Sequence, residues 1–247
     1  MAAISFENIT KSFRSGLKRS TVLRALNLTV SQGEIFGFLG PNGAGKSTSI
    51  KLLLRFIRPD RGRILVDGLD TARDPFQRLI GYQPESPFFY ENLTALETLR
   101  FAAKASEVQR SSIRQRTLDV LEKMNLSDAA SRPIRTYSKG MKQRLALAMA
   151  LIHDPKIYVL DEPMSGLDPL GRRLISDAIR ELGRQGRTVF FSSHILSDVE
   201  SLCDRIGILH RGDLLYSGSV EDFAKEASSL EDGFVHLIES HDNGEGN

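Results

Sequence analysis

The sequence predicts an α/β protein with a mostly parallel core sheet, an N-terminal antiparallel β subdomain and a helical subdomain. Three observations support this prediction. Apolar runs typical of buried strands alternate with helical patterns, a glycine-rich turn joins one such run to a helix, and one internal stretch shows helical spacing alone. Strands that alternate with helices indicate a mostly parallel sheet covered on both faces.

The first part of the chain predicts strands of both kinds. The segments "AISFENI" and "LRALNLTV" alternate apolar and polar residues, which is typical of antiparallel strands. "GEIFGFLG" is expected to be a buried strand that runs into a glycine-rich turn, and "KSTSIKLLLRFI" has helical spacing. "GRILVDG" predicts another strand between turn glycines.

The middle of the chain predicts helices, and the last third returns to alternating elements. Residues 94–126 contain "TALETLRFAAKA" and "SSIRQRTLDVLEKMNL", whereas "KIYVLD", "RTVFFSSH" and "DRIGILH" are expected strands separated by helices such as "PLGRRLISDAIRELGRQ". We therefore expect one domain over residues 1–227, with a helical subdomain at about 84–150 inserted in its α/β core. Residues 228–247 form a C-terminal tail whose last residues, "HDNGEGN", are expected to be disordered.

Composition is that of an ordinary soluble globular protein. Of the 247 residues, 40% are hydrophobic and 26% are charged, and the net charge of +2 gives no reason to expect a nucleic-acid partner. Cys203 is the only cysteine, so a reducing interior is expected. The longest strictly apolar run, "LALAMALI", is far shorter than the ~20 residues that cross a bilayer.

The segment "GPNGAGKS" has the spacing G-x-x-x-x-G-K-[ST] between a predicted strand and a predicted helix. Glycines let such a loop curl so that its N–H groups point at phosphate oxygens, and the helix N-terminus adds a favourable dipole. Lys46 can reach the β- and γ-phosphates, and the Ser47 hydroxyl can ligate Mg²⁺. The predicted nucleotide site comprises Gly40, Pro41, Asn42, Gly43, Ala44, Gly45, Lys46, Ser47 and Thr48.

Two acids, Asp161 and Glu162, follow the predicted strand "IYVL". Charges at the solvent end of a strand are common, but a phosphate loop also needs a carboxylate to hold hydrated Mg²⁺, and Asp161 fits that role. Glu162 can polarise a water for attack on the γ-phosphate. His194 follows another strand and Gln83 a third; taken alone, that histidine is more often structural and that glutamine carries almost no signal.

A second candidate anion site lies about ninety residues beyond the phosphate loop. In "YSKGMKQRLALAMALI", Ser138 and Gly140 precede a long apolar helical run, so their backbone and the helix N-terminus can bind an anion. The alternative is an ordinary capped helix with Ser138 as its N-cap.

Taken together, the order of these motifs resembles that of the nucleotide-binding subunits of ABC transporters over essentially the whole chain. The matching segments are "GPNGAGKST", "GYQPES", "YSKGMKQR", "IYVLDEP", "SGLD" and "SSH". "YSKGMKQR" looks most like subunits that serve export-type or multidrug-type permeases. It departs from the family's L-S-G-G-Q pattern, because Tyr137 replaces leucine, Lys139 the first glycine and Met141 the glutamine.

The resemblance implies an ATPase that uses ATP and Mg²⁺ and pairs head to tail, so that Ser138 and Gly140 of one cassette cover the ATP on the other's phosphate loop. The resemblance places Gln83 in the loop that reaches Mg²⁺. It implies that His194 contacts the γ-phosphate and the attacking water. Asp168 in "SGLD" is expected to cross the dimer interface. Phe13 in "TKSF" matches the position that stacks on adenine, with core packing as the alternative.

The implied partners are a separate transmembrane permease and a second nucleotide-binding subunit, identical or different. The implied location is the cytoplasmic side of the cell membrane, as a peripheral protein of a bacterial inner membrane. "SPFFYENL" is a candidate contact patch for the permease, with burial in the cassette's own core as the alternative. The rivals are a soluble ABC-type ATPase acting on ribosomes or DNA, and a P-loop GTPase; the second lacks an Asn-Lys-x-Asp element.

Overall fold

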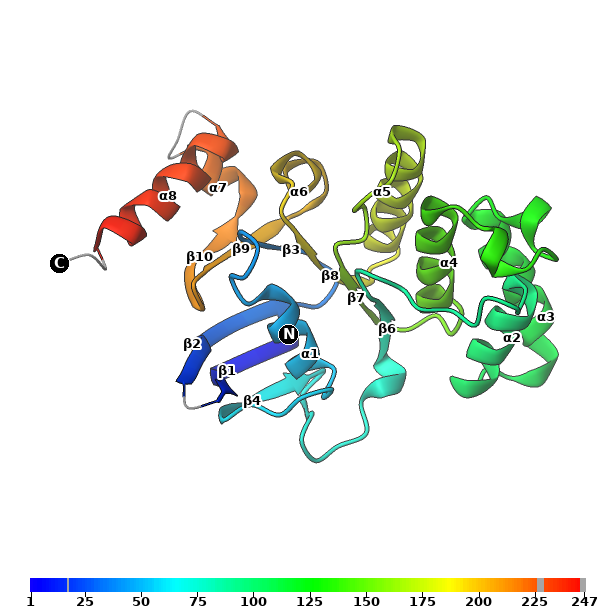
Figure 1. Cartoon of the computed structure of the whole chain (residues 1–247), viewed down its shortest axis with the longest axis horizontal. Coiled ribbons are helices and arrows are strands. Elements are labelled where there is room, and N and C mark those ends of the chain that lie inside the picture. Colours follow the sequence, from blue (N-terminus) through cyan, green and yellow to red (C-terminus); the bar gives the residue numbers. More distant parts are fainter. Residues whose placement is uncertain (17, 226–228, 245–247) are drawn as a thin grey trace. The chain divides into compact units, whose positions relative to one another are not determined.

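The computed structural model describes residues 1–16, 18–225 and 229–244, and Figure 1 shows their helices and strands. The chain divides into two compact units: unit 1 comprises Met1–Phe76 and Phe190–Asn247, and unit 2 comprises Gln77–Val189. An antiparallel sheet and a second sheet rich in parallel strands confirm the predicted α/β fold class. The domain limits expected from the sequence stay a prediction.

The N-terminal antiparallel sheet has the strand order β2-β1-β4-β5. Its strands are β1 (Ala2–Ser15), β2 (Lys18–Ser31), β4 (Arg61–Val66) and β5 (Leu69–Asp70). Ile4, Phe6 and Ile9 of β1 are buried, and a register shift between Phe6 and Ile9 interrupts the alternation of side chains. β1 and β2 pair as far as Ser15 and Lys18. The two strands therefore continue as a paired hairpin beyond Phe13.

The second sheet supplies strands to both units. In unit 1, β3 (Ile35–Leu39) pairs in parallel with β9 (Arg205–His210), which pairs antiparallel with β10 (Asp213–Ser219). In unit 2, β6 (Ile80–Gln83) pairs in parallel with β7 (Ile157–Asp161). The chain passes from unit 2 to unit 1 within β8 (Thr188–Ser193). Every residue of β3 and β7 is buried, as in sheets covered on both faces.

The core of unit 1 holds three aromatic rings beneath the start of the phosphate loop. Phe36 and Phe38 of β3 lie 5.9 and 5.4 Å from the ring of Phe190, measured between centroids. All three side chains are fully buried. Helix α1 (Lys46–Leu53) follows β3 after a six-residue loop, so a rigid strand fixes the position of that loop.

Unit 2 contains the predicted helical stretch. Its helices are α2 (Ala95–Ala105), α3 (Arg110–Lys123), α4 (Lys139–Leu151) and α5 (Pro169–Arg184), with short 3-10 turns at Gln77–Leu79, Ser127–Ala129 and Ile134–Thr136. α2 starts at a capping box, in which the Thr94 hydroxyl accepts from the Glu97 N–H and the Glu97 carboxylate accepts from the Thr94 N–H. Local sequence therefore defines where this helix begins.

Three helices follow in the C-terminal part of unit 1: α6 (Leu196–Leu202), α7 (Val220–Lys225) and α8 (Leu230–Gly244). The disorder expected for "HDNGEGN" was wrong for residues 241–244, which are helical; residues 245–247 lie outside the described part. Asp242 anchors this end of α8 because its carboxylate lies 2.7 Å from His210 Nε2 and 3.2 Å from Arg211 Nη1. Among the described residues, no helix combines the length and apolar character that crossing a membrane requires.

Candidate nucleotide site

The phosphate loop of unit 1 has an open inner side. Gly43 adopts φ +82° and a side chain there would meet nothing within 4 Å, so the backbone is free to face a ligand. The Ala44 N–H donates to the Pro41 carbonyl at 3.2 Å, which closes the turn. Gly45, the N-cap of α1, has no side chain to occupy the helix N-terminus. The loop therefore has the shape of a cradle for phosphate oxygens.

Lys46 lies across this loop. Its side chain is buried, and Nζ donates to the carbonyl oxygens of Gly40 at 2.5 Å and Pro41 at 3.3 Å. The loop's own backbone thus holds the ammonium group where the chain turns. Ser47 and Thr48 follow in the first turn of α1 and are partly exposed. An ammonium group, two hydroxyls and a glycine-rich backbone match the donor set that a nucleotide polyphosphate requires.

Two further predicted residues belong to unit 1. Phe13 is 43% exposed on β1, with Lys11 Nζ 5.3 Å from the centre of its ring. Burial in the core, the alternative for this ring, is therefore wrong. His194 is exposed directly after β8. The neighbouring Ser193 hydroxyl accepts from the Ile195 N–H at 3.0 Å, which fixes the backbone around the histidine.

The predicted acids lie at the end of β7 in unit 2. Asp161 and Glu162 are 5% and 8% exposed. Glu162 has φ +48°, a left-handed conformation that a non-glycine residue adopts at a cost of about 1–2 kcal/mol. Backbone strain of this kind occurs at functional sites, where the surrounding structure enforces it.

Gln83 lies on the strand next to these acids. It pairs with Leu160 in the parallel register of β6 and β7, so both strands end in polar side chains at the same edge. Its side chain is fully buried, Nε2 lies 3.5 Å from Gln143 Oε1, and Oε1 has no hydrogen-bond partner among the described residues. Burial, with smaller contributions from Asp161 and Glu85, raises the pKa of the adjacent Tyr82 to about 12.

The second candidate anion site is exposed at the start of α4. The Ser138 hydroxyl accepts from the Met141 N–H at 3.2 Å, so this residue is the helix N-cap. Tyr137 is buried and its hydroxyl donates to the Ala129 carbonyl at 2.7 Å. The substitution of leucine by tyrosine is therefore accommodated in the interior and leaves the motif's exposed atoms in place.

The start of α4 adjoins the loop that carries "SGLD". A Cβ at Gly140 would lie 3.4 Å from Leu167 Cδ2, and the Lys139 side chain lies against Gly166. Asp168 is exposed and caps α5, its carboxylate accepting from the Gly171 N–H at 2.7 Å. Two exposed helix N-termini thus come together on unit 2, each capped by a side chain that sequence analysis selected.

The predicted residues divide between the two units. Unit 1 holds the phosphate loop, Phe13 and His194, whereas unit 2 holds Gln83, Asp161, Glu162, Ser138, Gly140 and Asp168. Sequence reasoning missed Gln143 of α4, which is buried, faces Gln83 and donates to the Glu85 carbonyl at 2.8 Å. It lies between Lys142 and Arg144, ahead of the apolar run of the helix, so the sequence carried no signal of its burial.

The chain is similar to ATP-binding proteins of one family. A profile described as ABC transporter matches residues 23–165. An uncharacterized ABC transporter ATP-binding protein of Nostoc sp. is 46% identical over 90% of this chain and 68% of its own length. A lantibiotic transport ATP-binding protein of Streptococcus pyogenes is 36% identical over 87% of this chain and 92% of its own length. A linearmycin resistance ATP-binding protein of Bacillus subtilis is 36% identical over 87% of this chain and 69% of its own length.

Solved structures are similar over the same length. The structure of an ATP-binding subunit of an ABC transporter has a TM-score of 0.87 and 32% identity, covering 95% of this chain and 99% of its own. A dimeric ATP-binding cassette in a post-hydrolysis state, bound to ADP and phosphate, has a TM-score of 0.82 and 25% identity, covering 88% and 98%.

Proposed function

We infer the function from one premise: the chain belongs to the ABC transporter family. It is an ATP-binding and ATP-hydrolysing subunit that works as a dimer around two ATP molecules and drives transport through a separate permease. A soluble ATPase acting on ribosomes or DNA is not favoured, because relatives over nearly their whole length are transport proteins.

We propose a composite site for each ATP. The observation that carries this proposal is that one chain has two candidate anion sites, the phosphate loop on unit 1 and the exposed start of α4 on unit 2. The loop backbone and Lys46 hold the phosphates of ATP, and the Phe13 ring stacks on adenine. Ser138 and Gly140 of the second cassette contact the γ-phosphate, and Asp168 contacts the partner across the interface. ATP then joins two cassettes, and its hydrolysis lets them part.

Mg²⁺ would be held by Ser47, Gln83 and Asp161. The unpartnered, buried Gln83 Oε1 supports this assignment, since Mg²⁺ prefers oxygen ligands and a buried carbonyl oxygen without a partner is rare. When bound, Mg²⁺ neutralises charge on the phosphates. Because Gln83 is fully buried and also faces Gln143 of α4, a change at Gln83 is transmitted to that helix.

Glu162 acts as the general base that takes a proton from the attacking water, and His194 contacts the γ-phosphate and that water. The carboxylate of Glu162 follows Asp161 directly, so one strand end supplies both a metal ligand and a base.

The permease docks on unit 2 beside Gln83. The side chains of Phe88 and Tyr90 are 91% and 74% exposed, whereas Phe89 is buried, so this loop offers two large rings to a partner. The protein then works as a peripheral subunit on the cytoplasmic side of a bacterial inner membrane. Relatives named for lantibiotic transport and linearmycin resistance support export as the direction.

The test is a pull-down of tagged Glu162→Gln protein from detergent-solubilised membranes with and without Mg·ATP. We expect a polytopic membrane protein to be recovered in both conditions, together with a second cassette only when Mg·ATP is present. Lys46→Ala is the control, which we expect to recover the membrane protein but no second cassette. Recovery of ribosomes or DNA without any membrane protein would overturn the transporter assignment.

A further inference from the structure

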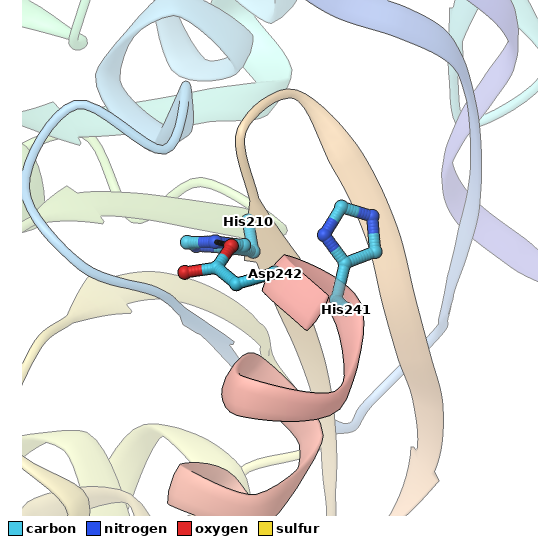
Figure 2. A group of neighbouring side chains, drawn as sticks. All are labelled: His210, His241 and Asp242. Atoms are coloured by element: carbon cyan, nitrogen blue, oxygen red, sulfur yellow. Dashed lines mark hydrogen bonds and ion pairs between the residues drawn. The ribbon is translucent and has the colours of Figure 1, made fainter. Parts of the chain in front are cut away.

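A cluster of two histidines and one aspartate lies in unit 1, outside the nucleotide motifs. His210 ends β9, and His241 and Asp242 lie near the end of α8, as Figure 2 shows. One ligand atom from each residue lies within 4.8 Å of the other two. His210 Nε2 is 2.7 Å from Asp242 Oδ1, and the two imidazole rings meet edge to face at 5.5 Å.

The cluster contains polar atoms that the protein does not satisfy. His210 is 7% exposed, and Nδ1 of both His210 and His241 is buried without a hydrogen-bond partner among the described residues. A buried polar atom without a partner costs ~1–3 kcal/mol, so such atoms are rare in folded proteins. Of the two, the His241 Nδ1 points to a ligand that binds nitrogen, because that residue offers a ligand atom within 4.8 Å of those of His210 and Asp242.

We propose that His210, His241 and Asp242 bind a divalent transition metal ion of the Zn²⁺ type. Two imidazoles and one carboxylate are a donor set for Zn²⁺, whereas Mg²⁺ and Ca²⁺ prefer oxygen ligands throughout. Three protein ligands leave the fourth tetrahedral position to water. The ion replaces the proton that His210 and Asp242 otherwise share.

Asp213 of β10 is the outer partner of this site. Its Oδ2 lies 3.9 Å from His241 Nε2, so it can orient that imidazole while Nδ1 faces the ion. Metal-binding histidines commonly have a carboxylate on their other nitrogen, and loss of that carboxylate weakens metal binding.

Two arginines limit the affinity. Arg211 Nη1 lies 3.2 Å from Asp242 Oδ1, and Arg24 Nη1 lies 3.1 Å from Asp213 Oδ2. The charges of two carboxylates and two guanidinium groups cancel before the ion binds. Binding therefore depends on the metal–ligand bonds rather than on net charge, and we expect an affinity below that of a four-ligand structural zinc site.

The site connects α8 to the strand that supports the phosphate loop. The Leu209 carbonyl, one residue before His210, packs so closely on Gly40 that a Cβ there would lie 2.2 Å from its oxygen. Gly212, two residues after His210, donates to the Ala44 carbonyl at 3.0 Å. A bound ion thus pins the end of α8 to the β9–β10 turn on which this loop rests.

The experiment uses the full-length, tag-free protein, stripped with EDTA and held without ATP. We would titrate it with ZnCl₂ by calorimetry and with CoCl₂ by visible absorption, which reports tetrahedral coordination. The variants are His241→Ala and Asp242→Asn. His236→Ala is the matched control, because His236 is an exposed histidine on the same helix. Asp213→Asn tests the outer partner, with ~10–100-fold weaker binding expected.

Support would be binding of one ion per chain in wild type and His236→Ala, and its loss in His241→Ala and Asp242→Asn. Equal Zn²⁺ binding by wild type and both ligand variants, or no binding by wild type, would overturn the proposal. Hydrogen exchange of peptides from residues 230–244 of the wild type adds a readout that needs no variant. Zn²⁺ should slow their exchange, and an unchanged exchange rate at saturating Zn²⁺ would contradict the pinning of α8.

Discussion

Gly140→Ala should make the protein more stable and less active, and these opposite effects separate fold from function. The residue is second in α4, and an added Cβ would lie 3.4 Å from Leu167 Cδ2 and 3.9 Å from Ser138 Oγ, which are ordinary contacts. The fold therefore accepts alanine. In a helix interior, alanine stabilises the folded state by ~0.5–1 kcal/mol relative to glycine, and the gain is somewhat smaller near a helix end. For a chain of this size that gain raises Tm by about 1–4 °C.

Catalysis should respond in the other direction. If the α4 N-terminus meets the γ-phosphate, the added methyl group keeps the phosphate from the backbone. A lost hydrogen bond to a charged group is worth about 1.5–3 kcal/mol, which corresponds to a ~10–150-fold lower rate. Phosphate release under saturating Mg·ATP measures the rate, and thermal unfolding measures stability.

Gly186→Ala is the control, for which we expect a loss of stability without a loss of activity. Gly186 lies just beyond α5 with φ +71°, and an added Cβ would meet nothing within 4 Å, so only backbone strain of ~1–2 kcal/mol results. We expect lower stability and an unchanged rate per folded molecule. A Gly140→Ala protein that hydrolyses ATP at the wild-type rate would refute the phosphate contact. One that is less stable than wild type would refute the packing argument.

Three further predictions follow from particular side chains. Glu162→Gln should bind ATP but release phosphate at least ~100-fold more slowly and elute as an ATP-bound dimer in size-exclusion chromatography; normal turnover would remove Glu162 from its role. Ser138→Gly keeps most of the N-cap stability, with a loss of only a few tenths of a kcal/mol, but should lose ATPase activity, whereas Thr94→Gly at the cap of α2 should keep it. Burial raises the pKa of the Cys203 thiol well above its usual range, so at pH 7 to 8 native protein should react with iodoacetamide far more slowly than unfolded protein; equal rates would show an accessible thiolate.

Local motifs were enough to select the candidate site residues, because these residues follow strand ends and helix starts. The strand before Gly40 and the strand that ends at Asp161 are continuous apolar runs, and in each case the selected residues stand where the run ends. Ser138 as an N-cap was also readable, since a polar residue precedes a helical apolar run. In these cases the chemistry and its position are both encoded within a few residues.

Tertiary contacts explain what the sequence did not predict. Asp242 holds the end of α8 against His210, a residue 32 positions away. Without knowledge of that contact, the polar and glycine-containing sequence of this tail predicts disorder. Gln143 acquires meaning only because it faces Gln83 across unit 2. The rings of Phe88, Phe89 and Tyr90 are alike in sequence, yet only the middle one packs inward.

The most direct test of the shared ATP site mixes two inactive proteins. Lys46→Ala removes the phosphate-loop ammonium, and Gly140→Asp places a carboxylate where the γ-phosphate should approach. With either variant alone, both of the shared sites that a pair of chains could form would be defective. In a mixed dimer, the loop of the Gly140→Asp chain and the α4 N-terminus of the Lys46→Ala chain are both intact, so one site is complete.

If equal amounts of the two variants pair at random, half of the dimers are mixed, and each mixed dimer has one complete site out of two. About a quarter of the wild-type ATPase rate should therefore return if the sites act independently. The measurement is phosphate release by the 1:1 mixture after co-refolding or co-expression, compared with each variant alone. Recovery of activity on mixing is the result that the shared site predicts. A mixture as inactive as its components, with mixed dimers verified by two different tags, would contradict it.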